Sequence, residues 1–316
     1  MTNTMKLGIS ECLLGERVRY DGGHALDPYL CYTIGRFVTF VPVCPEAECG
    51  LGIPREPMRL VGDPASPRLV TTGTARDLTE RMVRYARKRV ADLENEELSG
   101  FIFKTRSPSS GMERVKVYNE KGAPVRKGVG IFARVFMEHF SLVPVEDEER
   151  LCDPDLRAHF IERIFILKRW RDLIAQRPKR GTIVDFHARD KLLIMSHSLK
   201  HYRELGRLVA SAKDLPIHEL LPRYQNQLIE ALRIRSSVKK HSNVLLHILG
   251  YFKKELSGDE KQEALEIIEQ YRHGYVPLIV PITLFNHFVR KYDKQYLKQQ
   301  YYLNPHPLEL KLRNHA

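Results

Sequence analysis

Three short apolar runs, each followed at once by a polar loop, constrain the fold of this chain most strongly. The runs occupy 5–10, 37–43 and 100–105, and their length and their β-branched and aromatic content are typical of buried strands. A helical pattern lies at 77–98, and another is expected at 129–140. Strands alternating with helices predict an α/β domain with a mostly parallel, Rossmann-like sheet. In such sheets, ligands bind beyond the carboxyl ends of the strands.

Cysteines lie in the loops that would meet at this edge. Cys12 follows the first strand by two residues, Cys44 follows the second strand at once, and Cys49 comes five residues later. Thiolates are soft ligands that select zinc, copper(I) or iron–sulfur clusters. Spacing alone leaves three interpretations open. The thiols are part of a structural zinc site, they hold a [4Fe–4S] cluster with one open iron, or they pack as small apolar residues.

The second half of the chain has a different rhythm, because helical periodicity runs through it without strand-like alternation. An acidic and proline-containing stretch at 146–155 separates the halves. We therefore predict an α/β catalytic domain over 1–148 and an all-α domain over 155–316. Helices are expected at 155–176, 182–197, 218–234, 238–256 and 258–274.

Positive charge is concentrated in the helical half. The chain carries a formal net charge of +12. Residues 1–150 hold 22 Lys and Arg against 21 Asp and Glu, whereas 151–316 hold 29 against 18. This imbalance favours a polyanionic partner for the second half, with nucleic acid as the first choice.

The chain is expected to be a cytoplasmic protein without a membrane partner. No apolar run approaches the ~20 residues that span a bilayer, and the N-terminus lacks the apolar segment of a secretory signal. Five cysteines make an odd count without a dense pattern, which indicates free thiols in a reducing compartment rather than a disulfide framework.

The loop sequences around the cysteines carry a family resemblance. The stretches 12–23, 41–63 and 103–118 together resemble the bacterial thiouracil desulfidases, formerly DUF523. The resemblance implies an oxygen-sensitive [4Fe–4S] cluster on three protein thiolates, whose open iron takes the sulfur of a thiolated pyrimidine while water supplies the replacing oxygen. Many members carry a third-loop Cys where this chain has Ser110. We therefore predict that the ligand has moved to the second loop, so that the cluster ligands are Cys12, Cys44 and Cys49.

Further roles can be assigned around an open iron. Glu46, directly after Pro45, is the candidate proton shuttle that activates water and protonates the departing group. Its alternative is a helix-capping or surface carboxylate. Ser107 and Ser109 are predicted to hydrogen-bond the pyrimidine edge, with a simple turn as the alternative. The remaining predicted substrate-binding residues are Arg17, Arg19, Arg55, Lys104 and Ser110.

The helical half resembles a second bacterial domain, DUF1722, through the stretches 185–209, 239–254 and 271–282. The fusion resembles tRNA 4-thiouridine desulfidases and implies that this half selects the substrate. Basic residues contact phosphates, and rings stack on unpaired bases. The predicted RNA-binding residues are His187, Arg189, Lys191, Lys239, Lys240 and His241.

The predicted function is the removal of sulfur from 4-thiouridine in tRNA, which gives uridine. Two alternatives remain at this stage. One is a desulfidase for free thiopyrimidines or nucleotides, in which the helical half serves stability or dimerisation. The other is a non-catalytic nucleic-acid-binding protein with a structural zinc.

Overall fold

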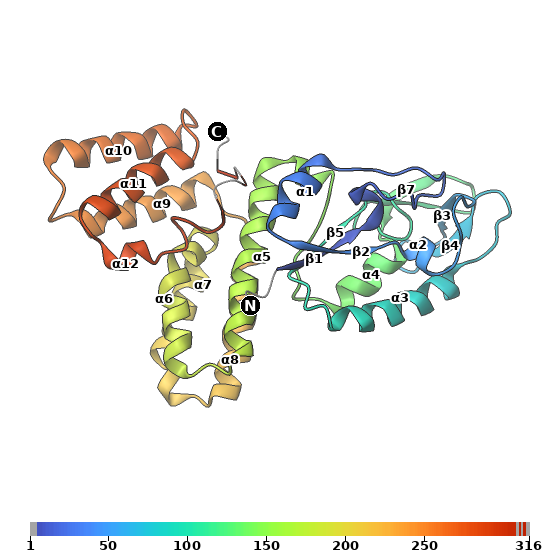
Figure 1. The fold of residues 1–316 in the computed structure, drawn as a ribbon, viewed down its shortest axis with the longest axis horizontal. Coiled ribbons are helices and arrows are strands. Elements are labelled where there is room, and N and C mark those ends of the chain that lie inside the picture. Colours follow the sequence, from blue (N-terminus) through green and yellow to red (C-terminus); the bar gives the residue numbers. More distant parts are fainter. Residues whose placement is uncertain (1–4, 308–309, 311, 314–316) are drawn as a thin grey trace. The chain divides into compact units, whose positions relative to one another are not determined.

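The structure is a computed structural model, and it describes residues 5–307, 310, 312 and 313. It divides into two compact units, Met1–Phe160 and Ile161–Ala316. The division falls inside helix α5 (Pro154–Ala175). The first unit combines two sheets with helices, whereas the second is built from helices (Figure 1). The predicted fold class, α/β followed by all-α, is confirmed.

The first sheet contains the predicted strands. It has the order β2-β1-β5-β8, and all its neighbouring strands are parallel. The bounds are β1 (Lys6–Ser10), β2 (Thr39–Val43), β5 (Gly100–Phe103) and β8 (Val145–Asp147). Sequence reasoning missed β8, because it has only three residues and lies in the stretch interpreted as a linker.

Helices α3 (Thr79–Glu94) and α4 (Ile131–His139) lie side by side against this sheet (Figure 1). Their buried faces meet the strands in an aromatic cluster, in which Phe101 and Phe136 have ring centroids 4.6 Å apart. Burial of rings this large is a major stabilising contribution to the unit. The short helices of the first unit are η1 (Glu11–Leu14), α1 (Pro28–Tyr32), η2 (Ile34–Arg36), α2 (Pro45–Glu48) and η3 (Arg150–Cys152).

A second sheet was not predicted from the sequence. It has the order β4-β3-β6-β7, and only its central pair, β3 and β6, is parallel. The strands are β3 (Met58–Val61), β4 (Arg68–Thr71), β6 (Val115–Tyr118) and β7 (Pro124–Gly128). One face packs Leu60, Leu69 and Val117 into a core with α3, and the other face carries charged side chains.

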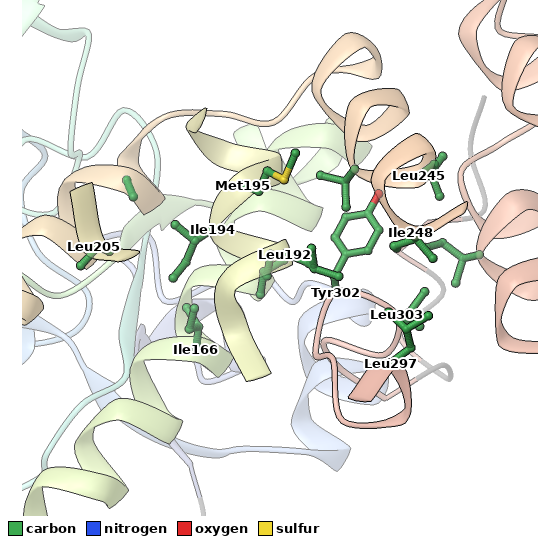
Figure 2. Packing of buried hydrophobic residues seen from close by; sticks show 14 of the residues in the cluster. Ile166, Leu192, Ile194, Met195, Leu205, Leu245, Ile248, Leu297, Tyr302 and Leu303 are labelled. Atoms are coloured by element: carbon green, nitrogen blue, oxygen red, sulfur yellow. The ribbon is translucent and has the colours of Figure 1, made fainter. Parts of the chain in front are cut away.

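The helices of the second unit surround one continuous apolar core. Figure 2 shows part of it, where Leu192 and Met195 of one helix meet Leu245 and Ile248 of another and the ring of Tyr302. Beyond α5, the helices are α6 (Arg180–His197), α7 (Leu199–Ala210), η4 (Ala212–Asp214), α8 (Ile217–Arg233), α9 (Val238–Leu249), η5 (Gly250–Phe252), α10 (Gly258–Arg272), α11 (Ile279–Lys291) and α12 (Gln295–Lys298).

Candidate active site

A cavity of about 490 Å³ opens at the carboxyl edge of the first sheet. All four parallel strands end at this edge, so the loops that follow them meet there, as the sequence predicts. Residues from each of these loops line the cavity: Glu11 and Cys12 after β1, Cys44 to Glu46 after β2, Lys104 to Ser110 after β5, and Glu148 and Glu149 after β8.

The three candidate thiols are not in disulfides. Cys12 and Cys44 are buried and line the cavity, and an ionised Cys44 would raise the pKa of both Cys12 and Cys49 through its charge. Cys49 is half-buried and is not part of the cavity lining. Its Sγ lies 3.4 Å from the carbonyl oxygen of Glu46. The structure thus brings two of the predicted ligands into the cavity, whereas the side chain of Cys49 packs against the core of the second sheet.

Burial is the main influence on these thiols. It raises the pKa of Cys12 to about 11, against a smaller opposing effect of Lys104, and it also raises the pKa of Cys44 and of Cys49. Such thiols stay protonated near neutral pH unless a cationic centre displaces the proton. Buried cysteines of this kind are poor nucleophiles on their own.

The loop that carries Cys44 and Cys49 is fixed by short contacts. Glu48 accepts a hydrogen bond from the backbone N–H of Cys44 at 2.8 Å and another from the hydroxyl of Tyr85 at 2.7 Å. Arg81 of α3 donates to the carbonyl oxygens of Cys49 and Gly50, both at 2.8 Å. The thiol-bearing turn is therefore held on a rigid helix and not on a free loop.

Two neighbouring side chains hold Glu46 in the cavity wall. Its Oε1 accepts a hydrogen bond from the hydroxyl of Ser109 at 2.7 Å, and its Oε2 accepts one from Nε of Arg55 at 2.9 Å. Arg55 and Glu46 also form an ion pair in which both side chains are largely buried. The hydroxyl of Ser107 lies 3.0 Å from that of Ser109 and extends the chain of polar groups. This arrangement orients one carboxylate toward the space beside the thiols.

The loop that follows β5, which carries Ser107 to Gly111, is held in place by the start of α4. The backbone N–H groups of Gly130 and Phe132 donate to the carbonyl oxygens of Gly111 and Ser109 at 2.8 and 2.9 Å. A Cβ atom at Gly130 would lie 2.5 Å from the backbone of Ser109, so only glycine permits this close approach. The segment that leads into α4 thus helps to place the serines of the cavity.

The four cations among the predicted substrate-binding residues lie in different surroundings. Arg19 lines the cavity, whereas Arg17 is exposed and outside its lining. Arg55 is engaged by Glu46, and Lys104 forms an ion pair with Glu148. Two of the four cations therefore pair with largely buried carboxylates, whereas Arg19 pairs with the exposed Asp21 at 3.5 Å. Sequence reasoning missed Glu148, because the short strand that positions it was not predicted.

The predicted RNA-binding residues of the helical half fall into two groups. His187 and His241 are buried, and their Nδ1 atoms each lie 3.1 Å from a tyrosine hydroxyl, of Tyr224 and Tyr302 respectively. Burial lowers the pKa of His241 to about 3, so this ring is neutral near neutral pH. The prediction that these two rings face RNA is not met by their placement inside the helical core. The exposed or half-buried members are Arg189, Lys191, Lys239 and Lys240.

The described residues contain neither a preformed metal-ligand cluster nor a membrane-spanning helix. Across residues 5–307, 310, 312 and 313, no three His, Cys, Asp or Glu side chains are arranged to hold a metal ion. No helix in that part of the chain is long and apolar enough to cross a membrane.

Known proteins resemble each half. A family model described as 2-thiouracil desulfurase matches residues 7–148, and one described as a protein of unknown function, DUF1722, matches 191–307. The uncharacterized protein YbgA of Escherichia coli (strain K12) is 31% identical over 153 residues, which cover 48% of this chain and 90% of YbgA. The uncharacterized protein YbbK of Bacillus subtilis (strain 168) is 32% identical over 108 residues, which cover 33% of this chain and 71% of YbbK.

One solved structure also matches. It is a [4Fe-4S]-dependent thiouracil desulfidase, TudS, which is 27% identical to this chain. The match covers 47% of this chain and 94% of TudS, with a TM-score of 0.39.

Proposed function

We propose that this chain, which belongs to the 2-thiouracil desulfurase family and carries a DUF1722 domain behind that part, removes sulfur from thiouridine in tRNA and leaves uridine. We further propose 4-thiouridine as the preferred nucleoside, on the sequence resemblance. The observation that carries the proposal is a cavity lined by two buried thiols, Cys12 and Cys44, and by the oriented carboxylate of Glu46, at the sheet edge where such folds bind ligands. The cavity volume lies within the usual range for small-molecule sites.

The donor set supports a [4Fe–4S] cluster. We propose that Cys12 and Cys44 of the cavity and Cys49, five residues after Cys44, hold it, because these three thiols lie in the loops that resemble the family's cluster-binding loops. When bound through three thiolates, the cluster supplies one open iron, a soft Lewis acid that suits the sulfur of a thiocarbonyl.

The protein's own groups provide the proton chemistry. Replacement of a C=S sulfur by oxygen consumes one water, breaks the carbon–sulfur bond and needs a base to take a proton from the water. We assign this role to Glu46, and the contacts of Arg55 and Ser109 that fix the direction of its carboxylate support the assignment. The same group can return a proton to the departing sulfur. The serine hydroxyls provide hydrogen bonds for the polar edge of the pyrimidine.

The basic helical half supports a polymer substrate. Its surface carries Arg189, Lys191 and Lys239, and polynucleotide binding depends mainly on cations that neutralise phosphates. A thiolated base inside folded tRNA has to leave its stack at a cost of a few kcal/mol, which phosphate contacts elsewhere would offset.

The proposal of a cluster is tested by purification under nitrogen. We expect a brown protein that contains about four irons per chain and loses its colour in air. A colourless preparation with one zinc per chain, even after anaerobic reconstitution with iron and sulfide, would contradict the proposed centre.

A further inference from the structure

A second hollow adjoins the candidate active site on the same unit. We call it the outer-face groove, and it has a volume of about 730 Å³. It lies along the second sheet, between residues of β3, β6 and β7 and the loop that follows β5. Thr105, Arg106, Pro108 and Glu149 line both this groove and the thiol cavity. The two hollows are therefore separated by one shared wall.

The outer-face groove owes its charge to the alternation of side chains along the strands. Leu60 and Val117 are buried in the core, so their neighbours Arg59 and Lys116 lie on the opposite face of the sheet. Arg126 is directly opposite Lys116 in the register of β6 and β7. Three adjacent strands thus each place a cation on one face, although like charges at opposed positions destabilise a sheet.

The cations of the groove differ in whether a carboxylate of the protein neutralises them. Arg106 pairs with Glu149, and Arg150 pairs with Glu113 and Glu146. Among the described residues, by contrast, no carboxylate lies within ion-pair distance of Arg59, Lys116 or Arg126. The six cations that line the groove face only three carboxylates, and they are Arg59, Arg106, Arg114, Lys116, Arg126 and Arg150.

Arg59 also carries a hydrogen-bond donor without an acceptor among the described residues. Its Nε is buried and has no hydrogen-bond partner within the described part of the chain, while its guanidinium lies over the ring of Tyr118, 5.4 Å from the centroid. An unsatisfied charged donor is costly unless an acceptor binds to it. Cations and an aromatic ring on one open sheet face are also the means by which sheets hold unpaired nucleic acid strands.

We propose that the outer-face groove binds the phosphodiester backbone of a polynucleotide whose thiolated base enters the neighbouring cavity. The proposal rests on the proposed function, since it assigns a place to the part of the same substrate that flanks the reacting base. Phosphate is the ligand that matches the free guanidinium and ammonium groups. A free thiopyrimidine has no phosphate and would not use the groove.

The net charge of the first 150 residues gives no indication of this basic surface. Residues 1–150 are nearly neutral, because 21 acidic residues balance 22 basic ones. The fold separates the two signs, so that the acidic side chains at the thiol cavity pair locally while the cations of β3, β6 and β7 remain free. According to this proposal, the first unit contacts the RNA as well, so the basic helical half does not supply all of the phosphate contacts.

The test uses the full-length chain with Lys116→Gln and Arg126→Gln together, two exposed side chains whose loss leaves the core intact. The matched control is Arg87→Gln with Lys88→Gln on the exposed side of α3, which removes the same charge. Binding to a tRNA transcript is measured against salt. We expect the groove variant to bind about tenfold more weakly than the control and its log–log salt slope to fall by about one to two, since each contact to a single strand contributes about 0.7.

Activity provides the second readout. The groove variant should desulfurate free thiouridine as fast as the wild type, whereas its KM for thiolated tRNA should rise. If the affinity for tRNA and the salt slope match those of the control, the proposed surface is wrong. If the groove variant loses tRNA binding but the wild type desulfurates no substrate, the surface stands and the proposed function fails.

Discussion

At the scale of single residues, the account depends on how one carboxylate is held. Glu46 is oriented by Arg55 and Ser109, and it lies two residues after Cys44 and three residues before Cys49. A carboxylate in this position is a proton carrier if the chemistry uses water, and it also neutralises the largely buried guanidinium of Arg55.

Replacing Glu46 by Gln should therefore lower turnover about 10²-fold or more while the iron content stays unchanged, because Gln keeps the shape but cannot take a proton. The control is Glu16→Gln, an exposed carboxylate outside the cavity lining. Iron analysis and initial rates on one preparation check the prediction. Loss of iron in the Glu46 variant would instead indicate that the carboxylate supports the cluster.

The cysteines give a second prediction at this scale. Cys12→Ala, Cys44→Ala and Cys49→Ala should each lose iron after anaerobic reconstitution, because each removes one of three proposed thiolate ligands. Cys31→Ala and Cys152→Ala are the controls and should load fully, since Cys31 lies in α1 and Cys152 in η3, outside both the cavity lining and the turn between Cys44 and Cys49. A full cluster in the Cys49 variant would show that the third ligand lies elsewhere.

At the scale of elements, the close packing of α4 on the third loop is the most specific feature. Gly130→Ala places a methyl group 2.5 Å from the Ser109 backbone, so the helix or the loop has to move. We expect the free energy of unfolding to fall by about 1–3 kcal/mol, as for other overpacked sites. Gly181→Ala is the control, because nothing lies within 4 Å of the added atom. Urea denaturation measures both, and equal stability would contradict the described contact.

Helix α9 supplies a prediction about pH. The unfolded His241 has a pKa near 6.5, and burial lowers the folded value to about 3. The unfolded state thus binds more protons between these values, so this residue costs stability as the pH falls below about 6.5. His241→Gln should lose less stability than the wild type between neutral pH and about pH 5. Exposed His273→Gln is the control, and identical pH slopes for all three proteins would count against it.

The same elements show what the sequence predicts and what it leaves open. The three parallel strands and the meeting of their loops follow from short apolar runs separated by helices, a local pattern. The second sheet does not, because its strands are short and carry charges such as Arg59 and Lys116 on one face, which weakens the apolar signal. The burial of His187 and His241 depends on packing between distant helices, which no local pattern reports.

At the scale of the whole molecule, the chain couples a small cavity to large basic surfaces. The thiols and Glu46 lie in the first unit, whose outer-face groove carries free cations, and the second unit contributes most of the net charge. This composition suits a polymer substrate that is positioned by its phosphates and read at one base. A free base has no phosphates and would not need these cations.

The most direct test of the central claim follows the sulfur. The full-length protein, loaded with its cluster under nitrogen, is incubated with tRNA that contains 4-thiouridine, and the digested nucleosides and the released sulfide are measured. The account predicts that 4-thiouridine disappears, that uridine takes its place, and that the Cys44→Ala variant leaves the tRNA unchanged. If the loaded wild-type protein leaves thiouridine intact in tRNA and as a free nucleoside, the assignment as a desulfidase is wrong.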